Sequence, residues 1–172
     1  MILFLLMFLI LYTGCDLYTI HFSKKENSGE NSKDNSNSSS SSSNPTQFNG
    51  VMLLENMQGD ILTDQADGII GSLGLMSSAC IGPTKSYVEP AHGSAPDISG
   101  KNIANPYSMI GSVALKLEKC FDLNEEAKLV WDSMINLFKD GFRTIDLADQ
   151  RTEKSKILST SDFGNRVVEY IK

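Results

Sequence analysis

Two aspartates four residues apart are the first candidates for chemistry in this sequence. Asp60 and Asp64 follow the apolar run Val51 to Leu54, in a segment whose apolar residues recur at helical spacing. A helix places residues i and i+4 on one face, where two bare carboxylates repel each other. A hard divalent cation removes this repulsion, because Mg²⁺ or Mn²⁺ takes oxygen ligands and often uses one or two carboxylates. Taken alone, such a pair is more often a solvated helix face; together with the loop described next, it predicts a metal site.

A second candidate is the loop from Glu89 to Pro106, which is rich in residue types that hold a nucleotide. Its glycines let the backbone approach a ligand closely, and its prolines fix the path of the chain. His92 and the amide of Asn105 offer a stacking surface and an edge partner for adenine. The backbone N–H groups from Gly93 to Ala95 can face the ribose and the phosphates.

Asp97 in this loop is the residue that discriminates between cofactors. A carboxylate accepts hydrogen bonds from both hydroxyls of an adenosine ribose but repels a 2′-phosphate, so an acid here favours NAD over NADP. The alternative is a turn in which Asp97 only caps the backbone. The predicted cofactor-binding residues are His92, Gly93, Ser94, Ala95, Pro96, Asp97, Ile98 and Asn105.

Both segments resemble parts of the isocitrate/isopropylmalate dehydrogenase family, the β-decarboxylating dehydrogenases. Gly59 to Asp64 is similar to the family's metal motif Gly-Asp-Ile-Leu-Ser/Thr-Asp, and Glu89 to Pro106 is similar to its nucleotide-binding loop. Gly71 to Gly82 and Gly141 to Leu147 also resemble family segments. The resemblance covers roughly residues 50 to 172, about the C-terminal third of a family member, and favours the 3-isopropylmalate branch.

The resemblance implies an α/β fold, here a C-terminal fragment of the family fold with helices packed on an incomplete sheet. It implies oxidative decarboxylation of a 2-hydroxy acid with NAD and Mg²⁺ or Mn²⁺. We expect 3-isopropylmalate, a substrate of leucine biosynthesis, with isocitrate, tartrate and D-malate as alternatives. Full-length relatives are implied to be homodimers, and the implied location is the cytoplasm or an organelle matrix.

The family's catalytic Lys, Tyr and Arg residues have no recognisable counterpart in this chain. We therefore predict no catalytic residue, and we expect the chain alone to be inactive. The alternative is a non-catalytic remnant, membrane-anchored or not, that keeps the nucleotide loop.

The first 49 residues differ in composition from the rest. Met1 to Leu11 is almost entirely apolar but shorter than the roughly 20 residues of a bilayer span. Residues 1–22 resemble a signal-peptide core with a lipoprotein box at Cys15, which would allow membrane contact only through residues 1–15; the alternative is an artefact of the reading frame. Residues 23–49 are rich in Ser and Asn, which predicts a disordered linker before a domain at 50–172.

Charge and helical periodicity complete the prediction. A formal net charge of -6 argues against nucleic-acid binding, because phosphate contacts need a basic face. Helices are predicted over 107–121 and 125–139, and a closing helix is predicted after the capping residues Ser159 to Asp162. The first helix is expected to bury Met109, Ile110, Val113, Ala114, Leu115 and Leu117, and the last to bury Phe163, Val167, Val168 and Ile171.

Overall fold

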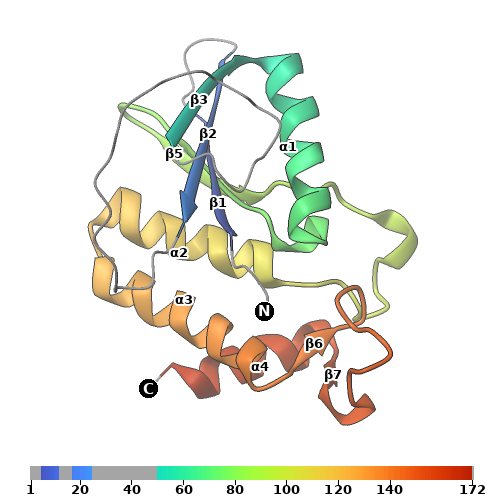
Figure 1. Ribbon diagram of the computed structural model, residues 1–172. Coiled ribbons are helices and arrows are strands. Elements are labelled where there is room, and N and C mark those ends of the chain that lie inside the picture. Colours follow the sequence, from blue (N-terminus) through green and yellow to red (C-terminus); the bar gives the residue numbers. More distant parts are fainter. Residues whose placement is uncertain (1–4, 12–16, 25–49, 172) are drawn as a thin grey trace, which may run out of the picture.

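A five-stranded sheet in the order β3-β2-β1-β4-β5 and four helices make up most of the computed structural model (Figure 1). The structure describes residues 5–11, 17–24 and 50–171. The strands are β1 (Leu5–Leu11), β2 (Leu17–Lys24), β3 (Gly50–Glu55), β4 (Ser77–Ile81) and β5 (Ser86–Pro90). β1 is parallel to β4, and the other three pairings are antiparallel. The α/β class predicted from the sequence is confirmed.

The apolar N-terminal segment supplies two inner strands of this sheet, which the sequence did not lead us to expect. A continuous apolar run has no period by which to separate a buried strand from a signal-peptide core. Ser23 and Lys24, placed in the predicted linker, end β2. The rest of that linker and the predicted lipoprotein box at Cys15 lie outside the described residues. Within the described part of the chain, no helix has both the length and the apolar character needed to cross a membrane.

The apolar run from Val51 to Leu54, whose composition predicts a short buried strand, forms β3 and continues directly into α1 (Asn56–Ile70). The prediction that this strand is buried was wrong for Leu53, which is 64% exposed. The reason is its place in the sheet, since β3 is an edge strand whose one neighbour is β2. α1 packs at this end of the sheet, against β2 and β3.

The helices α2 (Tyr107–Phe121) and α3 (Asn124–Lys139) confirm the predicted helices at 107–121 and 125–139. α4 (Thr160–Tyr170) confirms the closing helix, and the hydroxyl of its N-cap, Ser159, accepts a hydrogen bond from the N–H of Asp162 at 3.2 Å. α2 packs on β4 and β5, α3 packs on α2, and α4 packs on α3 (Figure 1).

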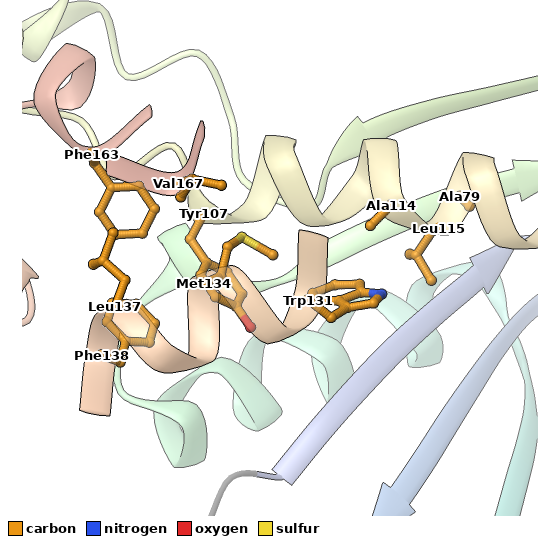
Figure 2. Packing of buried hydrophobic residues seen from close by; sticks show 10 residues of the cluster. All are labelled: Ala79, Tyr107, Ala114, Leu115, Trp131, Met134, Leu137, Phe138, Phe163 and Val167. Carbon is orange, nitrogen blue, oxygen red and sulfur yellow. The ribbon is translucent and has the colours of Figure 1, made fainter. Parts of the chain in front are cut away.

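The core lies between these three helices and the β4–β5 end of the sheet. Figure 2 shows its members gathered along the helices: Ala79, Tyr107, Ala114, Leu115, Trp131, Met134, Leu137, Phe138, Phe163 and Val167. The ring of Phe138 stacks on Tyr107 at a centroid distance of 5.3 Å and tilts against Phe163 at 5.8 Å. Such contacts add to the free energy of burying the rings.

Gly111 lets α2 approach β4 closely. A Cβ at this position would lie 2.2 Å from Ser77 Oγ and 2.6 Å from Trp131 Cη2, which is too close for any side chain.

The apolar side of α2 is narrower than we predicted, because Met109 and Val113 are each 46% exposed. Val168 on α4 is 68% exposed and Ile171, which directly follows α4, is 39% exposed, so the prediction of their burial was wrong. No described element covers these faces.

Two short strands, β6 (Arg143–Thr144) and β7 (Ile157–Leu158), form a separate parallel pair. Parallel strands end at the same edge, so the residues that follow β6 and β7 emerge side by side. Ile145 and Asp146 follow β6, while Ser159 and Thr160 follow β7 and begin α4. This arrangement brings two distant parts of the chain to one place.

Candidate functional site

An open pocket of about 920 Å³ lies where four segments meet. The first is Ser72–Gly74, between α1 and β4, which overlaps the short 3₁₀ helix η2 (Leu73–Leu75). The second is the loop after β5, and the other two are Ile145–Asp146 and Thr160. A pocket beside the carboxyl ends of parallel strands is a common place for a ligand in α/β proteins.

Most of the predicted cofactor residues line this pocket. Those that do are His92, Gly93, Ser94, Ala95, Ile98 and Asn105. Pro96 and Asp97 do not line it; they belong to the 3₁₀ helix η3 (Pro96–Ile98), in which both are exposed. Asp97 is adjacent in sequence to the lining residue Ile98 but is not itself part of the wall.

His92 is held in one tautomer by its neighbour. Its Nδ1 lies 2.9 Å from the carbonyl oxygen of Gly93, and because a carbonyl only accepts, Nδ1 carries the proton. Nε2 of the neutral ring is then a hydrogen-bond acceptor. Ala95 has a left-handed backbone with φ 41°, which costs about 1–2 kcal/mol for a residue with a Cβ. Strain of this kind in a pocket wall is typical of binding loops.

Asn105 lies at the back of the pocket and is only 9% exposed. Its Oδ1 accepts a hydrogen bond from the N–H of Tyr107 at 3.0 Å, at the start of α2, and its Nδ2 donates to Oδ2 of Asp146 at 3.1 Å. We predicted that this amide binds adenine. In the structure one of the two Nδ2 hydrogens is already engaged, so only the other is available to a ligand.

Asp146 and Ser72 are site residues that the sequence did not lead us to predict. The hydroxyl of Ser72 donates to Oδ2 of Asp146 at 2.5 Å, across 74 residues of sequence. Gly74 lies against Asn105, because a Cβ on Gly74 would be 2.7 Å from Asn105 Cβ. Asp146 belongs to a segment that resembles the family, but nothing local in the sequence shows that its carboxylate reaches both Ser72 and Asn105.

The loop is also fastened to the start of α4. Asn102 donates through Nδ2 to Ser161 Oγ at 2.9 Å and accepts through Oδ1 from the N–H of Ser161 at 3.0 Å. The N–H of Thr160 donates to the carbonyl of Asn102 at 3.0 Å, and its hydroxyl donates to the carbonyl of Ala104 at 2.5 Å. Asn102 has φ 56°, a left-handed conformation that asparagine tolerates better than most residues.

The predicted metal ligands, Asp60 and Asp64, both lie on α1 and are exposed. Within the described ranges, neither carboxylate has a hydrogen bond or an ion pair, while Thr63 between them is buried and donates to the carbonyl of Gly59 at 3.0 Å. The described residues contain no group of three or more His, Cys, Asp or Glu side chains that could hold a metal ion. Two free carboxylates on one helix fit a Mg²⁺ or Mn²⁺ ion that takes its other ligands from water or substrate.

Tyr107 and Cys80 are buried in the core and do not line the pocket. Burial raises the pKa of the Tyr107 phenol well above its usual range, so the phenol stays neutral. Burial also raises the pKa of the Cys80 thiol, which keeps it a weak nucleophile.

Comparison with known sequences places the chain among dehydrogenases. A model of the isocitrate/isopropylmalate dehydrogenase family matches residues 39–167, starting within the Ser-rich tract rather than at residue 50. The chain is 45% identical over 125 residues to 3-isopropylmalate dehydrogenase of Desulfitobacterium hafniense, covering 73% of this chain and 34% of that protein. It is 44% identical over 128 residues to the Thermotoga maritima enzyme of the same name, covering 74% and 35%. The chain spans about a third of the length of the curated relatives it matches.

Two solved dehydrogenase structures are also similar to this chain. An isocitrate dehydrogenase from Methylococcus capsulatus superposes with a TM-score of 0.61 at 38% identity, over 67% of this chain and 33% of that one. A β-decarboxylating dehydrogenase from Thermococcus kodakarensis, in its apo form, superposes with a TM-score of 0.58 at 34% identity, over 68% and 32%.

Proposed function

Because this chain belongs to the isocitrate/isopropylmalate dehydrogenase family, we propose that it supplies the NAD pocket and two metal-holding carboxylates of a β-decarboxylating dehydrogenase. The observation that carries the proposal is the pocket of about 920 Å³ whose wall includes six of the eight residues that sequence analysis assigned to the cofactor. This volume lies within the usual range for ligand pockets, about 300–1,000 Å³.

The loop after β5 would hold the adenosine half of NAD. His92 presents a ring whose Nδ1 faces the carbonyl of Gly93, and Asn105 keeps one amide hydrogen for a ligand. Backbone at Gly93, Ser94 and Ala95 lines the same pocket and carries small side chains, so a ribose or a phosphate can approach closely. Ile98 adds an apolar side chain to the wall.

Asp97, the sequence neighbour of the lining residue Ile98, would set the preference for NAD over NADP. Its carboxylate is exposed in the first turn of η3 and is free to accept hydrogen bonds from ribose hydroxyls. A 2′-phosphate at the same position would be repelled by the like charge, by an amount that falls as salt is added.

Asp60 and Asp64 would hold Mg²⁺ or Mn²⁺. The ion they hold would supply a positive charge for the carbonyl oxygen of the oxidised substrate, and NAD in the pocket would supply the hydride acceptor. The contribution of this chain is to place two carboxylates one helical turn apart on α1, ready for a cation that needs oxygen ligands.

The proposed substrate is a 2-hydroxy acid, with 3-isopropylmalate of leucine biosynthesis first, because the 3-isopropylmalate dehydrogenases are similar over almost three quarters of the chain. Isocitrate follows, since an isocitrate dehydrogenase is among the similar structures. Tartrate and D-malate are further candidates. Action in the cytoplasm or an organelle matrix, and homodimers in full-length relatives, are part of the same proposal.

Calorimetric titration of the purified chain with NAD and NADP tests the proposal. We expect saturable binding of NAD and weaker binding of NADP. Asp97→Asn should reduce the difference between the two, because the repelling charge is gone, whereas Asp122→Asn, an exposed acid at the end of α2 that does not line the pocket, should leave it unchanged. Absence of saturable NAD binding would overturn the proposal.

A second assay addresses turnover. The chain is mixed with Mg²⁺, NAD and, in turn, 3-isopropylmalate, isocitrate and D-malate, and NADH is followed by its absorbance. We expect no NADH from this chain alone, because the Lys, Tyr and Arg groups that the resemblance requires for proton transfer and carboxylate binding have no recognisable counterpart in it. Turnover that is lost in Asp60→Asn would refute the expectation of inactivity and support the metal role.

A further inference from the structure

We infer that Asp146 is a positioning residue for the pocket: its carboxylate joins Ser72 on one side to Asn105 on the other and so sets the shape of the site. The expected effect of Asp146 on cofactor affinity rests on the proposed function. Its hydrogen bonds to Ser72 and Asn105 do not depend on that proposal. Asp146 contacts the pocket residues rather than any reacting group, so its role is to hold other side chains in place.

A single oxygen atom of Asp146 accepts both hydrogen bonds. Oδ2 of Asp146 accepts from Ser72 Oγ at 2.5 Å and from Asn105 Nδ2 at 3.1 Å. Ser72 precedes β4 and Asn105 follows β5 in the chain, and they are separated from Asp146 by 74 and 41 residues of sequence. Hydrogen bonds to a charged acceptor are roughly twice as strong as bonds between neutral groups.

The carboxylate also fixes the direction of the Asn105 amide. An ionised carboxylate can only accept, so the side of Asn105 that faces Asp146 must be the NH₂ group. Oδ1 then points to the N–H of Tyr107, where it satisfies one of the free N–H groups at the start of α2. A flipped amide would lose both bonds at once.

The hydroxyl of Ser72 also takes part in two hydrogen bonds. Besides donating to Asp146, its hydroxyl accepts from the N–H of Gly74 at 3.2 Å and caps η2. Gly74 is the residue against which Asn105 lies, because a Cβ there would overlap it. Asp146 therefore closes a ring of contacts through Ser72, Gly74 and Asn105 at the back of the pocket.

The test compares Asp146→Ala and Asp146→Asn with a matched control, Asp149→Ala. Asp149 is an exposed acid three residues further along the same segment; it binds Arg151 and Thr152 and does not line the pocket. Backbone hydrogen exchange of the full, unliganded chain is measured in Ser72–Gly74 and at Tyr107. The side-chain amide signal of Asn105 is followed by NMR and assigned from its disappearance in Asn105→Ser.

We expect Asp146→Ala to speed exchange at these amides by about threefold, because two hydrogen bonds to an exposed carboxylate are lost, and to shift the Asn105 amide signal. Asp146→Asn keeps the size of the side chain and one oxygen acceptor, so it should recover only part of both effects, whereas a role limited to filling space predicts full recovery. Should Asp146→Ala prove unfolded, Asp146→Asn alone decides, through a shifted amide signal. Asp149→Ala should match the wild type.

The inference is overturned if the Asp146 variants leave the Asn105 signal and the exchange rates unchanged, or if Asp149→Ala changes them equally. NAD titration separates this result from the proposed function. An Asp146→Ala chain that binds NAD about tenfold more weakly supports both. If the wild-type chain does not bind NAD, the proposed function is refuted. The exchange and NMR measurements still decide the role of Asp146 in that case.

Discussion

The side chains of α2, α3 and α4 bury apolar atoms against one another, whereas the four segments around the pocket meet through hydroxyl, amide and carboxylate groups. Leu115, Met134, Leu137 and Phe163 of the helical core are fully buried. The contacts around the pocket, such as Ser72 to Asp146 and Asn102 to Ser161, are exposed. The two regions share α4, whose inner face enters the core and whose first residues hold the loop.

This difference predicts a division of roles. Burying a large apolar side chain contributes about 1.5–3 kcal/mol, whereas a typical hydrogen bond contributes about 0.5–1.5 kcal/mol net, and an exposed one less. The core should therefore determine whether the chain folds, and the polar contacts should determine the shape of the pocket. Substitutions matched between the two regions test this division.

The largest effect is expected from Phe163→Ala. Phe163 is fully buried on α4 and packs against Phe138, so its truncation should cost about 3–5 kcal/mol of the free energy of unfolding. The matched control is Val168→Ala on the same helix, where the side chain is 68% exposed and the expected change is within about 0.5 kcal/mol. Urea denaturation followed by circular dichroism measures both. Equal midpoints for the two variants would contradict the placement of the core.

A smaller loss is expected from Gly111→Ala. The new methyl group would meet Ser77 Oγ and Trp131, and overpacking of this kind costs about 1–3 kcal/mol. Gly164→Ala on α4 is the control, because a Cβ there meets nothing within 4 Å. Removing a helical glycine should stabilise the chain by up to about 1 kcal/mol. Opposite signs in the same denaturation experiment support the close approach of α2 to β4; a stabilising Gly111→Ala would rule it out.

The sequence predicted the helical core well, because its signals are local. Ala127, Val130, Trp131, Met134, Leu137 and Phe138 recur at helical spacing on α3, and all of them except the half-buried Val130 are buried. The prediction was wrong at Met109, Val113, Val168 and Ile171, where the sequence shows an apolar residue but not whether a neighbouring element covers it. Periodicity identifies a helix more reliably than the width of its buried face.

The pocket was predictable only in part. His92 and Asn105 could be found from the loop itself, since their residue types suit a nucleotide. Asp146 and Thr160 could not, because they enter the pocket through the parallel pairing of β6 and β7, and two-residue strands leave no readable pattern. Asp60 and Asp64 lie on one helix as predicted, but metal binding by them stays a prediction.

A local effect on the pocket is expected from Asn102. Asn102→Ala removes two side-chain hydrogen bonds to Ser161 and leaves a Cβ residue at φ 56°, a conformation that costs about 1–2 kcal/mol for residues other than glycine and asparagine. Asn102→Gly removes the same bonds without the strain. Exchange of the Thr160 and Ser161 amides should therefore be faster in both variants, and faster in Asn102→Ala than in Asn102→Gly. Unchanged exchange in both would show that the loop is held by other contacts.

The smallest effect is expected from Asp60→Asn, which tests the acid pair outside the pocket. Without metal, the variant should be more stable than the wild type by only about 0.2–0.5 kcal/mol, because it removes repulsion between like charges one helical turn apart. Added Mg²⁺ should raise the denaturation midpoint of the wild type in a saturable way, since a ligand that binds only the folded state stabilises it. Asp60→Asn should lose this response, whereas Glu126→Gln, an exposed acid in the first turn of α3, should keep it. If Mg²⁺ leaves the wild-type midpoint unchanged at concentrations that saturate Mg²⁺-dependent enzymes, the two carboxylates are a solvated helix face and the metal must find its ligands elsewhere.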